Sequence, residues 1–161
     1  MKEILINPDK RLRKKSRPIT VQDLKHGKHD ELIKEMKEIM LAKDGIGLAA
    51  PQINEHVRLI IVNTKDGIVV FCNPEITSQS WKKEVDEEGC LSVPNVTGLV
   101  KRNYQITVSA KKPSGEPFET TAKGLFSRVI QHEIDHLDGI LFIDKAKKIF
   151  KKNHEREDEK H

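Results

Sequence analysis

Residues 124–142 read GLFSRVIQHEIDHLDGILF, an apolar run that carries two histidines and two carboxylates in its centre. If the run is helical from Gly124, apolar side chains lie on nearly all of its sides, which is typical of a buried helix. A buried polar group costs free energy unless it finds a partner. We therefore predict a buried helix whose histidines, His132 and His136, have a partner inside the fold.

The length and composition indicate one globular domain. With 161 residues, the chain is long enough for one full hydrophobic core and too short for two. We expect a single catalytic domain over residues 1–150 and a charged tail over residues 151–161, which frays or extends as a solvated helix. No apolar run approaches the ~20 residues that cross a bilayer, and the N-terminus lacks a secretory signal. These features predict a cytoplasmic protein without a membrane partner, of bacterial or organellar origin.

Hydrophobic periodicity predicts a second helix and several strands. Apolar side chains recur at helical spacing in residues 30–43, so we expect an amphipathic helix there. Short β-rich runs between turn residues predict strands at 57–62, 68–72, 105–110 and 116–123. No long helix separates most of these strands, which favours antiparallel pairing. We expect an α+β fold of mainly antiparallel sheets around a buried central helix, with an N-terminal helix and a C-terminal helix or tail.

The spacing of His132 and His136 indicates a metal site. Residues four apart lie on one face of a helix, so both imidazoles can bind one ion. Glu133, next to the first histidine, can reach a water on that ion. The alternative is a pair of hydrogen-bonded histidines in the core, which the predicted burial of the helix makes costly.

Two histidines leave a catalytic metal one protein ligand short, and the sequence GCLS at 89–92 offers a third. A thiolate from Cys90 would give three protein ligands and one open position. The preceding Gly89 would let the backbone approach the site closely. The alternative for Cys90 is a small buried hydrophobic residue. We favour that interpretation for Cys72, which lies inside the β-rich run 68–72.

Three stretches together resemble the signature motifs of the peptide deformylase family. They are GIGLAAPQ at 45–52, EEGCLS at 87–92 and QHEIDH at 131–136, in that family's order and with its spacing. PDKRL at 8–12 also resembles the family's N-terminus, so the resemblance extends over residues 4–144. A lone HExxH motif is a weak signal, but three independent motifs are specific.

The resemblance implies that Cys90, His132 and His136 hold one divalent metal ion. Iron(II) is the ion that the family implies, and zinc, nickel or cobalt would bind the same ligands. The implied reaction is hydrolysis of the N-formyl group from the formyl-methionine of newly made polypeptides, with release of formate. Glu133 would act as the general base and then as the general acid.

The resemblance also assigns roles to residues around the metal. It implies that the Gln52 side chain and the Leu91 backbone N–H stabilise the oxyanion. Glu88 and Arg102 would pair to brace the Cys90 loop, while Asp135 would orient a ligand histidine or make a plain helix hydrogen bond. Backbone groups would bind the extended substrate as an added strand. The implied substrate-binding residues are Ile46, Gly47, Gly89, Leu125 and Val129.

Four residues depart from the family pattern. Asp86 and Arg128 stand where many relatives carry apolar residues around the methionine pocket. If both point inward they must pair, because an unpaired buried charge is costly. A place at the rim, with the Arg128 stem lying over Leu125, costs less and is our expectation. Asn95 and Thr97 replace a glutamate and an arginine near the substrate, which leaves the side-chain selectivity open.

Two dense basic clusters occupy residues 10–17 and 145–152 of a chain whose formal net charge is +4. Each cluster can be a solvated face, but such clusters also dock on phosphate-rich partners. The implied partners are formyl-Met nascent polypeptides. We hypothesise that residues 145–152 also dock on the ribosome, and we expect no DNA partner.

Two other functions share part of this pattern. A zincin-type endopeptidase also uses HExxH chemistry, but it needs a third ligand other than cysteine, and EGCLS disfavours it. An RNA-binding module with a purely structural metal needs a fourth protein ligand that closes the site. The placement of Gln52 and Glu133 as in the family disfavours that module.

Overall fold

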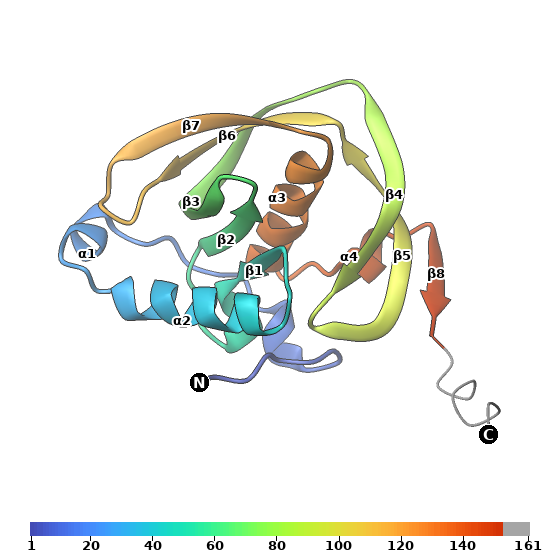
Figure 1. Cartoon of the computed structure of the whole chain (residues 1–161), viewed down its shortest axis with the longest axis horizontal. Coiled ribbons are helices and arrows are strands. Elements are labelled where there is room, and N and C mark those ends of the chain that lie inside the picture. The colour runs from blue at the N-terminus through green and yellow to red at the C-terminus, as the bar shows by residue number, and fades with distance from the viewer. Residues whose placement is uncertain (153–161) are drawn as a thin grey trace.

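The apolar run forms a helix, α3 (Gly124–Leu137), that contacts strands of two antiparallel sheets (Figure 1). The structure is a computed structural model that describes residues 1–152. The larger sheet has the strand order β1-β2-β3-β6-β7, and the smaller has the order β4-β5-β8. All pairings within these sheets are antiparallel, as predicted. The strands are β1 (Gly47–Ala49), β2 (Leu59–Thr64), β3 (Gly67–Gln79), β4 (Lys83–Cys90), β5 (Val93–Asn103), β6 (Gln105–Lys111), β7 (Pro117–Lys123) and β8 (Lys148–Lys151).

The position of α3 is determined by its apolar side chains. Ile130 and Leu137 are fully buried in one core cluster with Phe71 and Ile106 of the larger sheet. Burial of such a side chain contributes about 1.5–3 kcal/mol. Because these contacts anchor the helix, the polar residues of QHEIDH are carried on a rigid element.

Helix α2 (Asp30–Ala42) confirms the amphipathic helix predicted at 30–43. Its buried stripe consists of Ile33, Met36, Ile39 and Met40, which belong to a second core cluster with residues of β1 and β2. The other helical segments are short. They are η1 (Lys10–Arg13), α1 (Val21–Lys25), η2 (Ala50–Ile53) and α4 (Phe142–Lys145).

The four predicted strands are present as β2, β3, β6 and β7. Strand β3 is longer than predicted because it continues past register shifts after Cys72 and Ile76 to pair with β6. Cys72 is fully buried in the core, which confirms its prediction as a small buried residue. Burial raises the pKa of its thiol to about 12.

The β4–β5 hairpin is an element that the sequence did not predict. Residues 83–87 read KEVDE, which does not alternate between apolar and polar residues as a half-buried strand does. All five residues are exposed in the structure. The hairpin places Cys90 at the end of β4, where it is paired with Val93 across the turn.

The sequence analysis did not predict a strand at residues 148–151, which form β8 and pair with β5. The backbone of this basic segment gains hydrogen bonds along an edge of the hairpin that would otherwise be free. Residues 153–161 of the predicted tail lie outside the described residues. Within residues 1–152, none of the helices has the length and apolar character needed to cross a membrane.

Candidate metal centre and active site

Two elements bring the three predicted metal ligands together. Helix α3 carries His132 and His136 one turn apart, and the end of β4 carries Cys90. One ligand atom from each of these side chains lies within 4.8 Å of the other two. The Cys90 Sγ is 3.3 Å from His136 Nε2. The structure therefore places a thiol and two imidazoles around one point.

The donor set and its electrostatics fit a divalent metal ion. Burial opposes a charge on His132, but hydrogen bonds to Cys90 and Glu88 raise its pKa to about 10. Burial, with the His132 charge second, lowers the pKa of His136 well below its usual value. The site thus attracts positive charge while keeping one imidazole neutral, which is the form that binds a metal. One thiolate and two imidazoles match the preferences of zinc, nickel, cobalt and iron.

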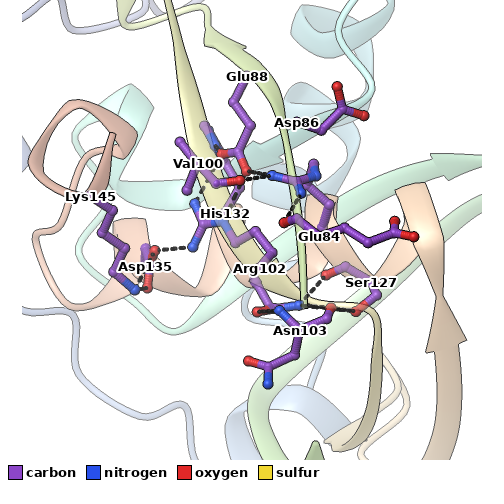
Figure 2. A network of polar contacts seen from close by, with 12 residues as sticks. Glu84, Asp86, Glu88, Val100, Arg102, Asn103, Ser127, His132, Asp135 and Lys145 are labelled. Carbon is purple, nitrogen blue, oxygen red and sulfur yellow. Dashed lines mark hydrogen bonds and ion pairs between the residues drawn. The ribbon is translucent and has the colours of Figure 1, made fainter. Parts of the chain in front are cut away.

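Glu88 links the two elements that carry the ligands (Figure 2). Its Oε1 accepts a hydrogen bond from His132 Nδ1 at 2.9 Å. Arg102 of β5 donates to both carboxylate oxygens through Nε and Nη2, each at 2.9 Å. Burial alone would raise the pKa of Glu88, but the hydrogen bonds from His132 and Arg102 lower it to about 2. The structure thus contains the Glu88–Arg102 pair that the sequence analysis predicted.

Glu133 lies beside the ligand atoms with one oxygen free. Its Oε1 is 4.0 Å from His132 Nε2, and its buried Oε2 has no partner among residues 1–152. Burial raises the pKa of Glu133 to about 7, although the His132 charge opposes this. A carboxyl with such a pKa can both accept and return a proton near neutral pH.

Gly47 in β1 makes room for this carboxylate. A Cβ at this position would lie 2.8 Å from Glu133 Oε1 and 2.9 Å from Val129 Cγ1. Any larger residue would push one of these side chains away. Glycine is therefore the residue that fits at this position without moving a neighbour.

Gln52 is buried in η2 and contacts the cysteine directly. Its Nε2 donates to Cys90 Sγ at 3.5 Å and to Ser92 Oγ at 3.0 Å, and its Oε1 accepts from Ala49 N at 2.9 Å. These bonds fix the amide group beside the ligand atoms. Ser92 is fully buried and was not predicted, although it is the last residue of EEGCLS.

A cavity of about 490 Å³ opens in front of these groups. All five residues predicted to bind substrate line it, and Leu91 does so as well. A Cβ at Gly89 would meet no described protein atom closer than Thr97 Cγ2 at 3.7 Å, so its protein neighbours do not require glycine there. Lys152 also lines the cavity and was not predicted.

Two predictions about charged residues are wrong. Asp135 does not orient a histidine or bond its own helix, because its oxygens pair with Arg102 at 2.6 Å and Lys145 at 3.0 Å (Figure 2). Arg128 is not at the rim: its side chain is buried and pairs with Glu88 at 2.7 Å. Asp86 is exposed, and within residues 1–152 its carboxylate accepts a hydrogen bond from Glu87 N alone. Asn95 and Thr97 both line the cavity.

The two antiparallel sheets, the buried HExxH helix that contacts both of them, and the cysteine at the end of β4 are features of a metal-dependent hydrolase. Comparison with known sequences gives the family. The profile of the polypeptide deformylase family matches residues 1–152, and the chain belongs to that family.

Individual relatives agree with this assignment. The chain is 42% identical over 162 residues to a peptide deformylase of Natranaerobius thermophilus, with 100% of this chain and 99% of that one covered. It is 50% identical over 117 residues to one of Clostridium botulinum, which covers 73% of this chain and 79% of the relative. The crystal structure of peptide deformylase from Thermotoga maritima is similar with a TM-score of 0.87 and 37% identity, covering 92% of this chain and 99% of that one. A Met-Ala-Ser-bound crystal structure of a peptide deformylase from Acinetobacter baumannii is similar with a TM-score of 0.86 and 34% identity. This match covers 91% of this chain and 98% of that one.

Proposed function

We propose that this chain hydrolyses the N-formyl group from the formyl-methionine of newly made polypeptides and releases formate. The observation that carries the proposal is the placement of Cys90, His132 and His136 around one point, beside Glu133 and a large cavity. The cavity is bordered by the exposed side chains of Ile46 and Leu125, so a peptide can enter from solvent. We place this activity in the cytoplasm, where formylated chains are made.

The ligand set would hold one divalent cation, with iron(II) as the physiological ion and zinc, nickel or cobalt as substitutes. Such an ion lowers the pKa of a coordinated water toward ~7 and polarises the formyl oxygen. The buried Glu88–Arg102 pair would keep His132 oriented for this ion, because His132 donates its Nδ1–H to Glu88.

Glu133 would accept the proton of the attacking water and then deliver it to the leaving amine. Its free Oε2 and its pKa of about 7 suit both steps. The Gln52 amide and the Leu91 backbone N–H would donate to the developing oxyanion. One Gln52 N–H contacts Cys90 Sγ. When Cys90 Sγ binds a cation, it becomes a weaker hydrogen-bond acceptor. The Gln52 N–H that contacts it is then available to donate to the oxyanion.

The substrate backbone would pair with β1. This strand lies at the edge of the larger sheet, with β2 on one side only. An extended peptide can therefore add to the free edge through backbone groups of Ile46 and Gly47. That pairing would direct the formylated end of the peptide toward Glu133.

The proposal is tested by formate release from a formyl-Met-Ala-Ser peptide with anaerobically purified protein, and the metal content is measured on the same sample. Anaerobic handling protects the thiolate and the iron from oxidation. The Glu133→Gln variant should keep its metal and lose about 10²–10⁴-fold in kcat. Metal-replete wild-type protein that releases no formate would refute the proposal.

We also propose that the basic segment 145–152 docks on the ribosome. The segment includes the exposed strand β8, whose Lys148 and Lys151 are both exposed. The variant Lys147→Glu/Lys151→Glu should co-sediment less with ribosomes than a control with the same charge change, Lys34→Glu/Lys65→Glu. Equal sedimentation of both variants would exclude this docking site.

A further inference from the structure

Arg128 is a charged side chain in the wall of the catalytic cavity, next to the apolar Leu125 and Val129. Positions 125, 128, 129 and 132 lie three or four residues apart and therefore share one face of α3. This face leads from the exposed Leu125 to the metal ligand His132. A peptide whose formyl group is at the metal ligands can therefore place its first side chain along Arg128.

The guanidinium of Arg128 is held in place by three acceptors on the β4–β5 hairpin, which Figure 2 labels. Its Nη1 donates to Glu88 Oε2 at 2.7 Å and to the Val100 carbonyl at 2.8 Å. Its Nη2 donates to the Glu84 carbonyl at 2.8 Å. A donor fixed by its own contacts is preorganised, so that a ligand does not have to order it.

Two N–H groups of Arg128 have no acceptor within residues 1–152, and the one on Nε can donate to a ligand. A guanidinium has five N–H donors, and three are used within residues 1–152. In that part of the chain, the fully buried side-chain atoms without a partner belong to Ser16, His56, Glu133 and His136. Arg128 Nε makes no hydrogen bond within residues 1–152 and is not among these atoms, so it is accessible, in agreement with the 8% exposure of the side chain. Since Arg128 lines the cavity, this accessible surface faces the substrate.

We propose that Arg128 is a specificity-determining residue that donates a hydrogen bond to a neutral acceptor on the first side chain of the substrate. Peptides that begin with formyl-methionine sulfoxide are then substrates as well as those that begin with formyl-methionine. The sulfoxide oxygen is a polar acceptor, whereas the thioether sulfur is a weak one. A carboxylate is disfavoured at this place because Glu88 and Glu133 line the same cavity. This inference rests on the proposed deformylase function.

The test compares kcat/KM for three formylated tripeptides that differ only in the first residue: methionine, norleucine and methionine sulfoxide, each followed by Ala-Ser. A hydrogen bond to a charged donor corresponds to a preference of about tenfold or more. Wild-type protein should process the sulfoxide at least as well as norleucine. In Arg128→Met, which keeps a similar length and removes all donors, the sulfoxide-to-norleucine ratio should fall about tenfold. Because both peptides meet the same sample, this ratio does not depend on metal content.

A matched control separates this role from bracing of Glu88. Arg102 also bonds Glu88 but does not line the cavity. Arg102→Lys should therefore lower kcat/KM for all three peptides by the same factor. If Arg128→Met does not fold, Arg128→Lys provides the test: an ammonium cannot reproduce the planar fork, and the ratio should still fall severalfold.

The outcomes distinguish the inference from the function on which it rests. An unchanged sulfoxide-to-norleucine ratio in a folded Arg128 variant would overturn the inference and leave the deformylase function intact. Absence of formate from all three peptides with metal-replete wild-type protein would instead refute the function. Calorimetric binding of the unformylated sulfoxide tripeptide to the zinc-loaded protein gives a second readout, and this binding should weaken in Arg128→Met.

Discussion

The Nδ1–H of His132 donates to Glu88 Oε1 at 2.9 Å, which leaves Nε2 as the ring nitrogen that can bind a metal ion in exchange for its proton. A carboxylate can only accept, so this contact selects one tautomer of the imidazole. Glu88 is itself held by Arg102 and Arg128, one from β5 and one from α3. The orientation of a metal ligand therefore depends on a buried ion network that spans both halves of the site.

Glu88→Gln should weaken metal binding about 10–100-fold, as is typical when the partner of a metal-bound histidine is changed. The amide can still bond, but it no longer enforces the tautomer or balances the two arginines. Competition with a chromophoric chelator measures the loss. Glu84→Gln is a suitable control, because only the backbone carbonyl of Glu84 takes part in the network. Equal affinities of both variants would contradict this role for Glu88.

The same carboxylate should make the metal-free protein sensitive to acid. The pKa of Glu88 is about 2 in the folded protein and 4.5 for a glutamate exposed to water, so its ionised form stabilises the fold above pH 4.5. That contribution, on the order of 3 kcal/mol, is lost as the pH falls from 4.5 toward 2. Denaturant titrations at several pH values should show a steeper acid loss of unfolding free energy for wild type than for Glu88→Gln. Parallel curves would contradict the prediction.

The helices were predictable because their signals are local. The stripe in residues 30–43 has a period of 3.6, and the apolar surroundings of QHEIDH indicate a buried helix, both without any knowledge of the tertiary structure. The β4–β5 hairpin lacks such a signal, since residues 83–87 are exposed on both faces. Its pairing depends on contacts with β8 and α3 that are distant in the sequence.

The residues of the site that were placed wrongly from the sequence also depend on contacts between distant segments of the chain. Helical spacing gives His132 and His136 directly. The third ligand, Cys90, lies in a separate part of the sequence, and its position beside the histidines depends on the tertiary structure. Arg128 was placed at the rim because burial of a lone charge is costly. The actual counter-charge, Glu88, lies 40 residues away in sequence, and Asp135 likewise pairs with the distant Arg102.

The rate of formate release should fall on the acid side as Glu133 becomes protonated. Burial raises the pKa of this carboxyl to about 7 without a metal, and a divalent cation beside it lowers the pKa again. We therefore expect kcat/KM to rise with pH along a limb whose midpoint is below 7. Asp135 is among the charges that raise this pKa, so Asp135→Asn should move the midpoint to lower pH. Measured pH–rate profiles that shift upward in this variant would argue against Glu133 as the base.

Gly47→Ala should impair catalysis while leaving the metal in place. The added methyl would meet Glu133 Oε1 at 2.8 Å and Val129 Cγ1 at 2.9 Å, and the flexible carboxylate can move away more easily than the helix. Gly47 does not have a positive φ, so alanine adds no backbone strain. Misplacement of a catalytic group by about 1 Å can cost about 10²-fold, and we expect a loss of that order in kcat with a smaller change in KM.

Gly89→Ala provides the comparison for Gly47→Ala. Both glycines line the cavity, but a methyl at Gly89 would make only an ordinary contact with Thr97 Cγ2 at 3.7 Å. Its effect on kcat should therefore be much smaller. Metal analysis and thermal unfolding of both variants would show whether site and fold are preserved. If Gly89→Ala lost as much kcat as Gly47→Ala, the loss could not be attributed to displacement of Glu133, because only the methyl at Gly47 reaches that carboxylate.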